Sequence, residues 1–582
     1  MASQKPGEWV QSLIARFDAQ LPVKKGQHTT QSIQNVEQNK ECLINVSNYK
    51  FSLVINGLTK ILQSISNTRL NGPEVERNFF ESQLIILDTL EQVLNSQPKD
   101  TSRLDEAMYV KLLLPEICKC LNWSTETTPL ALQLKTLASK VLYALSQNNF
   151  TAVFHRISAR LTTLSTCSED QSDLSDLDLI QHINVDMIRL IKLFNEISSK
   201  FKTLKQKSVI YTLAHNLEKA IWNWMDNYPH EFNNLHQKPD SELQDYCDKM
   251  FELFNSFTEN SKKKATVWPL QMMLLVLCPK ILEEIKNADA GAPCSPQMLK
   301  KKHFIDEARK ALSNPHGGSS KASQTEGAAV TFVRMCKAST YININDRPNV
   351  LFTLVQSVTH DLKTLLFSPP SSTKFSRSQG TIGQDIDLYI DCFVSFFRIN
   401  PYIGDLPKVC LNPQSPLIYH LVLVSALYKI ITQPRLAWWP EIRKMYSKAG
   451  ELRSMFNDAV NKVMQATASQ GPKTQFSTIT KMTGFKLSRP GEENTMQRYF
   501  LLGLVKLIHA DPLLMLHNPD KPGHEVQNST SELINGLVSL VHVQQMPEIA
   551  QEAMEALLRL HQPEIIALWN PEAPINTFWK IR

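Results

Sequence analysis

Apolar residues recur three and four positions apart along most of the chain, a spacing that places them on one face of an α-helix. The spacing is clearest between Gln497 and Gln562, where three such stripes follow one another. The stripes are Leu501, Leu504, Val505 and Ile508; Ile534, Leu537, Val538 and Val541; and Ile549, Ala553, Ala556, Leu557 and Leu560. Each stripe is too small to form a core alone, so we expect three helices that bury one another.

Residues that start and stop helices flank these three stripes. Asp511-Pro512 should end the first helix, because the residue before a proline is disfavoured in helical conformation. Ser529 and Glu532 have the spacing of a capping box, which predicts that the second helix begins there. Pro547 suits the first turn of the third helix, where a missing N–H leaves no hydrogen bond unmade.

The same helical period begins near the N-terminus and continues through the chain. Its stripes include Val10, Leu13, Ile14 and Phe17; Phe51, Val54, Ile55, Leu58, Leu62 and Ile65; Leu84, Leu87, Leu90 and Leu94; Val110, Leu113, Leu114, Ile117 and Leu121; Leu134, Leu137, Ala138, Val141 and Leu145; and Ile183 to Phe201. No convincing series of alternating strands interrupts them. The pattern predicts an all-α protein, arranged as an irregular HEAT/armadillo-like α-solenoid with repeats of about 40–47 residues.

Changes in composition divide the predicted array. We expect an N-terminal helical-repeat array over 1–286 and a flexible loop with one short helix over 287–327. Helical repeats then occupy 328–466, interrupted by a linker at 368–384, and a second linker covers 467–496. The final segment, 497–582, is predicted to hold HEAT-like helices that are truncated at their C-terminal edge. This truncation predicts a bare apolar face around Ile549 and Leu557, and hence self-association.

The bulk composition narrows the functional classes. The 582 residues are 42% hydrophobic and 20% charged, as in globular rather than disordered chains. A net charge of +6 does not by itself indicate nucleic-acid binding, and the apolar runs Leu270–Cys278 and Leu417–Ile431 fall short of the ~20 residues of a membrane span. The first residues contain no signal-peptide core, and the ten cysteines show no disulfide framework. We therefore expect a cytoplasmic protein, with a nuclear pool as a further option, that neither binds nucleic acid nor inserts directly into a membrane.

Sequence features of metal, nucleotide and catalytic sites are weak. Cys118 and Cys120 lack further Cys or His partners at zinc-site spacing. Gly380 and Gly383 are not followed by the Lys-Ser/Thr of a phosphate-binding loop. No nucleophile–base pair stands out in the sequence. We therefore predict no catalytic, cofactor-binding or metal-binding residue, and no cofactor.

Three further clusters admit a functional and a structural interpretation. The lysine triplets Lys262–Lys264 and Lys300–Lys302 would suit nuclear signals or acidic lipids, but solvated helix ends or loops are the favoured interpretation. Trp222, Trp224 and Tyr228 would suit base stacking, but core packing is favoured. The acidic loop Ser168–Asp178 lacks the ligand order of a calcium-binding EF-hand.

Several longer strings resemble the N-terminal part of neurofibromins. These strings are Glu8–Gln11, Arg16–Asp18, Asn39–Asn45, Leu84–Glu91, Cys336–Asn343, Met546–Leu558 and Leu568–Pro571. The resemblance runs from Met1 to the last residues without a large gap. It implies part of a large negative regulator of Ras signalling, which acts as a Ras GTPase-activating protein and self-associates through helical-repeat arms. It also implies partners in the cytoplasm and at the inner face of the plasma membrane.

The resemblance carries no catalytic residue into this chain. The Ras GTPase-activating domain of neurofibromins lies beyond the equivalent of Arg582, and its catalytic arginine has no counterpart here. Phe396–Pro401, which contains Arg398, resembles a string of such domains but lacks the accompanying arginine-bearing motif. We therefore expect a non-enzymatic scaffold for dimerisation or partner docking, which contacts other neurofibromin segments or, indirectly, Ras-pathway proteins. The alternatives are an independent adaptor that holds a peptide or helix in a solenoid groove and, least favoured, a cryptic enzyme.

Overall fold

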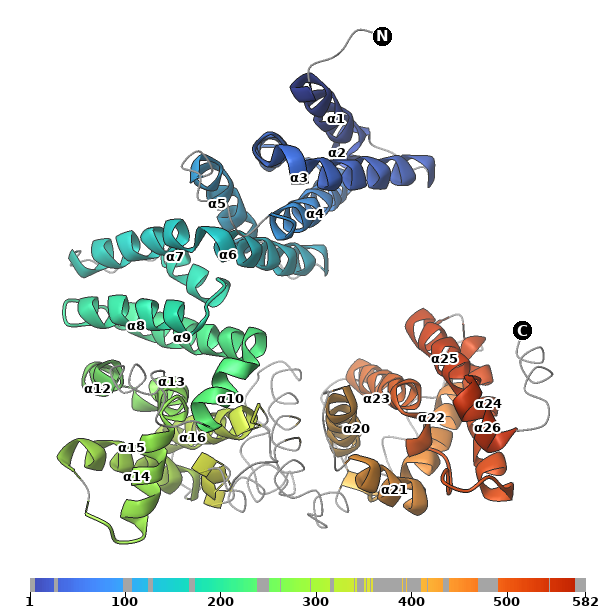
Figure 1. The fold of residues 1–582 in the computed structure, drawn as a ribbon. Helices are drawn as coiled ribbons and strands as arrows, with labels where there is room; N and C mark the ends of the chain where they lie inside the picture. Colours follow the sequence, from blue (N-terminus) through green and yellow to red (C-terminus); the bar gives the residue numbers. More distant parts are fainter. Residues whose placement is uncertain are drawn as a thin grey trace. The chain divides into compact units, whose positions relative to one another are not determined.

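The computed structural model describes most of the chain and is all-α (Figure 1). The described residues are 6–25, 30–97, 107–123, 129–166, 173–237, 251–261, 263–293, 295–313, 319–339, 341–342, 350–351, 353–355, 357–358, 390, 394, 410–415, 417–432, 439–468, 490–543 and 545–570. Every regular element within these ranges is a helix, as the sequence predicted.

The chain divides into two units, and the division falls inside one helix. Unit 1 comprises Met1–Thr331 and Tyr341–Val350, whereas unit 2 comprises Phe332–Thr340 and Leu351–Arg582. Helix α16, Ser319–Ser339, therefore contributes to both.

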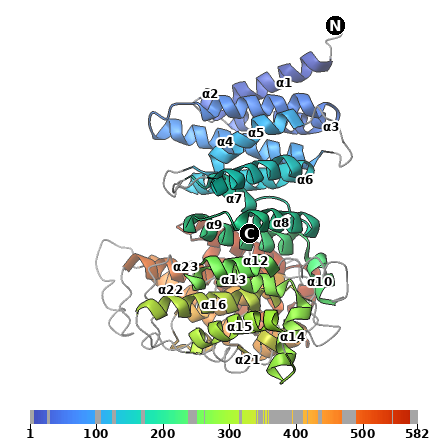
Figure 2. The same ribbon diagram turned by 90° about the vertical axis from the view of Figure 1, so that its left-hand side faces the viewer.

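Unit 1 is a succession of helices that pack mainly against neighbours in sequence (Figure 2). Its helices are α1 Pro6–Gln20, α2 Pro22–Lys25, α3 Thr30–Ser66, α4 Pro73–Asn95, α5 Ala107–Leu121, α6 Pro129–Thr166, α7 Ser175–Asp178, the 3-10 turn η2 Leu179–Gln181, α8 Met187–Phe201, α9 Lys207–Asn227, α10 Pro229–Gln237, α12 Phe251–Asn260, α13 Lys264–Val276, α14 Pro279–Asp289 and α15 Pro296–Ser313. Helix α4 packs against α3 and α6, and α6 continues the succession through its contacts with α5 and α8. Many of these helices begin at proline, whose fixed φ and missing N–H are tolerated in a first turn.

The two longest helices of unit 1 are each interrupted by a kink. Lys50 in α3 and Asn149 in α6 have non-helical backbone angles, with φ −134° and −126°. The Asn149 amide donates hydrogen bonds to the Tyr109 hydroxyl, at 2.7 Å, and to the Leu145 carbonyl, at 3.1 Å. The Asn149 side chain donates to a carbonyl of the preceding turn, and so it competes with the backbone hydrogen bonds of the helix. This competition accounts for the break in α6.

Two predicted features of unit 1 were wrong. The stripe from Ile183 does not belong wholly to one helix, because the Asp186 carboxylate accepts a hydrogen bond from the Arg189 N–H and caps α8 at Met187. The segment 287–327 holds the end of α14, all of α15 and the start of α16, and not one short helix in a loop. The predicted short helix, near Phe304–Leu312, is part of α15, which begins at Pro296 and buries Phe304, Ile305 and Ala308.

Unit 2 contains the helices that were most clearly predicted. They are α20 Leu417–Thr432, α21 Trp439–Ala449, α22 Glu451–Ala468, α23 Pro490–Ala510, the 3-10 turn η4 Pro512–Leu514, α24 His524–Val541, α25 Pro547–Leu560 and α26 Pro563–Trp569. The stripes of α23 and α25 are buried at every predicted position. Helix α23 packs against α20 and α25, and α24 packs against α22 and α25. The predicted linker 368–384 lies outside the described residues, as does most of 467–496, although α23 already begins at Pro490.

Helix α24 departs from the prediction at its start and in its buried face. It begins at His524, so Ser529 lies inside the helix and not at its cap. The Ser529 hydroxyl accepts a hydrogen bond from the His517 N–H at 3.0 Å and donates one to the Val526 carbonyl. The buried apolar face is Val526, Leu533, Leu537 and Leu540, whereas Ile534, Val538 and Val541 are only half-buried. The capping-box interpretation was wrong, because the Ser529 hydroxyl bonds the backbone N–H of His517 in the loop before α24 and not the N–H of a helix start.

The expected bare face at the end of the chain was also wrong. Ile549 and Leu557 are only 4% and 1% exposed. Helix α26 packs against α24 and α25. Its Trp569 ring donates a hydrogen bond to the Leu560 carbonyl at 3.0 Å and lies edge-on against His561. The short helix that follows Pro563 thus covers the face that was expected to be open.

Candidate docking groove on helices α3, α4 and α6

Two of the tryptophans singled out in the sequence serve a structural role. Trp224 and Trp222 are buried in α9, with their ring N–H groups bonded to Glu231 and Glu218. Their rings pack against Phe232 and Tyr341 respectively. The packing interpretation is therefore confirmed for the two tryptophans, whereas Tyr228 is half-buried and its hydroxyl donates a hydrogen bond to the Asn184 side-chain oxygen at 3.0 Å.

The two cysteines on α5 are buried thiols. Burial raises the pKa of Cys118 to about 11 and that of Cys120 to about 12. Such thiols stay protonated at neutral pH, whereas a metal ligand or nucleophile must be a thiolate. Within the described ranges, no group of three or more His, Cys, Asp or Glu side chains is placed to hold a metal ion.

The charged clusters are partly neutralised by neighbouring helices. Asp176 forms an ion pair with Arg156 of α6 at 2.9 Å, so the acidic loop has a basic partner that its own sequence lacks. In the triplet Lys300–Lys302, Lys301 is buried and Lys302 pairs with Asp289 at 2.8 Å. This triplet lies within α15 and is not the solvated helix end that we expected. Arg398 lies outside the described residues.

We compared the most hydrophobic helices with the length and hydrophobicity of a membrane span. In the part of the chain that is described, no single helix has the length and hydrophobicity of a membrane span. Helices α13 and α14 have them only when taken together, and that pair is bent by 101°.

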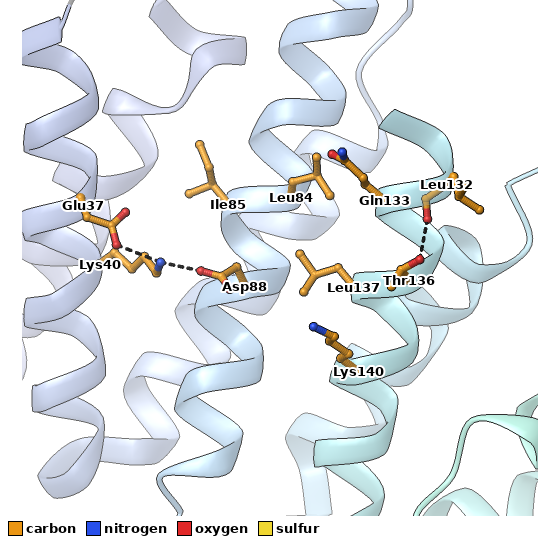
Figure 3. Close-up of a pocket in the computed structure, with 10 residues that line it drawn as sticks. All are labelled: Glu37, Lys40, Leu84, Ile85, Asp88, Leu132, Gln133, Thr136, Leu137 and Lys140. Carbon is orange, nitrogen blue, oxygen red and sulfur yellow. Dashed lines mark hydrogen bonds and ion pairs between the residues drawn. The ribbon is translucent and has the colours of Figure 1, made fainter. Parts of the chain in front are cut away.

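A groove on three helices of unit 1 is the strongest candidate for a functional surface (Figure 3). It has a volume of about 570 Å³ and is open to solvent. Its lining residues are Glu37 and Lys40 of α3, Leu84, Ile85 and Asp88 of α4, and Leu132, Gln133, Thr136, Leu137 and Lys140 of α6. The groove exists because α4 packs against both α3 and α6, and all three helices contribute side chains to it.

The apolar part of the groove consists of leucines and an isoleucine that are not fully buried. Leu84, Ile85 and Leu137 are half-buried, and Leu132 is 67% exposed. By contrast, the neighbouring positions Leu87, Leu134 and Ala138 are completely buried in the core. The sequence assigned Leu84 and Leu137 to the core stripes, because periodicity alone does not distinguish a core position from the lining of a groove.

The charged part of the groove is dominated by Lys40. Its ammonium lies 2.5 Å from an Asp88 carboxylate oxygen and 3.0 Å from a Glu37 carboxylate oxygen. Burial alone would lower the pKa of Lys40, but the hydrogen bonds and charges of Asp88 and Glu37 outweigh it and raise that pKa. Lys40 is thus a charged group whose ammonium contacts two carboxylates, one on its own helix α3 and one on α4.

Lys140 differs from Lys40 in having no acidic ion-pair partner among the described residues. Its side chain is exposed on α6, one turn after Leu137 (Figure 3). No described residue forms an ion pair with it. Among the described lining residues, the groove therefore combines an apolar surface with a cation, Lys140, that no described carboxylate neutralises.

The arrangement presents groups that can contact a bound partner. The lining side chains are aliphatic, amide, hydroxyl, carboxylate and ammonium groups, and the Thr136 hydroxyl already donates to the Leu132 carbonyl at 2.9 Å. No family model matches the sequence.

Proposed function

We propose that the chain is a non-catalytic helical scaffold that docks protein partners, built as an irregular HEAT/armadillo-like α-solenoid. The succession of helices that pack against sequence neighbours supports this arrangement, because each helix pair depends on the next for its buried face. The observation that carries the docking role is the groove on α3, α4 and α6, with its half-buried leucines and its unneutralised Lys140.

Within this proposal, the chain acts in a neurofibromin-like negative regulator of Ras signalling. In this role the chain contributes dimerisation or partner docking and bears on Ras indirectly. The support is the set of resembling strings from Glu8 to Pro571. The expected setting is the cytoplasm, with peripheral recruitment to the plasma membrane through partners.

An independent adaptor is the second candidate. The groove supports it equally, since a helix or peptide can occupy such a surface whether or not the partner belongs to the Ras pathway. The two candidates differ in the bound partner, which is a neurofibromin segment or a Ras-pathway protein for the scaffold and an unrelated protein for the adaptor.

Affinity capture from cell extract, with three forms of the chain, separates these candidates. The forms are the natural chain, Leu137→Asp in the groove, and Leu299→Asp at an exposed leucine of α15 that serves as the matched control. Proteins captured by the first and third forms but not by the second use the groove. Neurofibromin or Ras-pathway proteins among them support the scaffold proposal, whereas a set without either supports the adaptor.

A further inference from the structure

We propose that a lysine-rich edge of unit 1 binds the surface of an anionic lipid membrane, without insertion of the chain into the lipid. This edge, which we call the lysine edge, consists of Lys202 and Lys205 between α8 and α9, Lys207 at the start of α9, and Lys263 and Lys264 at the start of α13. The inference goes beyond the docking role and does not depend on the groove.

Two contacts bring the lysine-bearing segments together, although they are distant in the sequence. The Phe201 ring at the end of α8 lies edge-on against Phe257 of α12, with the ring centroids 4.7 Å apart. The Lys263 N–H donates a hydrogen bond to the Tyr211 hydroxyl at 3.2 Å, and Tyr211 lies one turn after Lys207 in α9. Helix α12 packs against α8, and α13 packs against α9 (Figure 2). The end of α8 and the starts of α9 and α13 therefore share one edge of unit 1.

The charges of the lysine edge are largely free. All five side chains are exposed. Within the described ranges, four of them form no ion pair, and the fifth, Lys264, has only a 3.6 Å contact with Glu307. Glu259, in the last turn of α12, is exposed and pairs with none of the five. The edge thus carries a positive charge that the described carboxylates do not neutralise.

Helix stability does not account for the position of these lysines. Lys207 is the first residue of α9, and Lys263 and Lys264, from the first lysine triplet, are the N-cap and the first residue of α13. The helix dipole is positive at this end, so a cation there destabilises the helix and an acidic residue is favoured. Neither helix has an acidic residue in its first turn or a side-chain cap. The arrangement therefore works against the two helices and attracts anions.

The chemistry of the edge favours a lipid surface over other polyanions. Neither 202–207 nor 261–264 contains an arginine or an aromatic residue. Arginine clusters recognise phosphopeptides and acidic motifs, arginines read the base edges of duplex DNA, and aromatic rings stack on single strands. Clusters of about four to eight basic residues without such groups suit the diffuse charge of an anionic leaflet, whose headgroups move to meet each ammonium.

The apolar residues of the edge indicate that binding is electrostatic. Phe201, Leu204 and Phe257 are at most 3% exposed, so they are not available to enter a bilayer. Binding should therefore weaken steeply with salt, because exposed charges are screened beyond about 8 Å at physiological ionic strength.

Sedimentation of the purified full chain with vesicles tests the proposal. One set of vesicles contains three parts phosphatidylcholine to one part phosphatidylserine, and the other contains phosphatidylcholine alone. We expect binding to the first set only. The double variant Lys205→Ala/Lys263→Ala should lower the partition coefficient about 25-fold, since each lysine near an anionic surface contributes about fivefold.

A matched double variant controls for net charge. Lys140→Ala/Lys219→Ala removes two exposed lysines that lie outside the lysine edge and should leave vesicle binding unchanged. Lys219 lies twelve residues after Lys207 in α9, which is about 18 Å along the helix and beyond the screening length. Glu259→Gln should strengthen binding, because it removes a negative charge beside the edge. Far-ultraviolet circular dichroism checks that each variant is folded.

Several outcomes would overturn the proposal. These are no binding to phosphatidylserine vesicles, equal binding to both sets, or equal losses in the two double variants. Duplex DNA that binds as tightly at the same salt, with the same loss in Lys205→Ala/Lys263→Ala, would identify nucleic acid as the polyanion. Full competition by glycerophosphoserine, at a concentration equal to that of the lipid headgroup, would identify a site for a free phosphoester. Leu137→Asp should bind vesicles like the natural chain, so failure of the groove and failure of the lysine edge are told apart.

Discussion

Lys40 of α3 and Asp88 of α4 form an ion pair of 2.5 Å at one side of the docking groove (Figure 3). The Lys40 side chain is only 12% exposed, and Glu37 contacts the same ammonium. The pair is separated by 48 residues in the sequence, and it fixes the two helices that carry half of the groove lining.

Lys40→Met should lower the free energy of unfolding by about 1 kcal/mol, the upper end for a pair whose carboxylate is still reached by water. Asp88 is 38% exposed, which limits the cost of leaving it unpaired. Lys140→Met is the control, and it should change stability by less than about 0.5 kcal/mol because its side chain is exposed and forms no ion pair with a described residue. Denaturant unfolding of the three proteins measures this difference, and equal losses would contradict the structural role of Lys40.

Leu504→Ala in α23 should cost about 2–5 kcal/mol, because the side chain is fully buried. The matched control is Leu558→Ala in α25, where the leucine is 43% exposed and the same substitution should be near neutral. Thermal or denaturant unfolding of the two variants gives the comparison. Similar effects of both substitutions would be inconsistent with the packing of α23 against α20 and α25.

Acid should destabilise the chain through His236 of α10. Its Nε2–H donates to the Val276 carbonyl at 2.9 Å, and its buried Nδ1 has no hydrogen-bond partner among the described residues. Burial lowers the pKa of His236 to about 4, from about 6.5 in the unfolded chain. The unfolded state therefore binds more protons between these values, and stability falls as pH is lowered through this window.

The expected loss from pH about 7 to about 5 is on the order of 2 kcal/mol for this histidine. Burial also lowers the pKa values of His182 and His420, so the natural chain is compared with His236→Gln, which retains both. The difference between the two pH dependences isolates His236. Parallel pH dependences would show that this histidine does not titrate as its surroundings indicate.

The chain alone should not accelerate GTP hydrolysis by Ras, because neither a finger arginine nor a docking domain for the switch regions is proposed within it. A single-turnover assay with purified chain tests this expectation. Stimulation that disappears in Arg398→Ala would instead assign a catalytic role to the Phe396–Pro401 string.

The helical class was predictable from the sequence, but the groove was not. Periodicity correctly placed Leu501, Leu504 and the α25 stripe in the core, because a helix buries one face whichever neighbour covers it. It also placed Leu84 and Leu137 in the core, where the structure shows half-buried groove residues. Their exposure depends on how α3 and α6 are positioned around α4, which is a tertiary property.

The packing of α26 against α25 is a second feature that the sequence did not predict. The apolar residues of α26 were present in the sequence, but nothing in their spacing showed that Trp569 would reach back to Leu560. Conversely, Ser529 and Glu532 matched a capping pattern that the structure does not use, because Ser529 instead bonds the chain at His517. Short local patterns mispredict the role of a side chain when that side chain forms its hydrogen bond with a residue outside the pattern.

Photo-crosslinking in cells tests the central claim, that the groove docks a protein partner, most directly. A photoreactive residue replaces Leu132, which is 67% exposed in the groove, or Leu299, which is 52% exposed on α15 and serves as the control. The account predicts a discrete set of crosslinked proteins at position 132 that is absent at position 299 and lost when Leu137→Asp is added. Crosslinks that are the same at both positions, or that persist in Leu137→Asp, would contradict it.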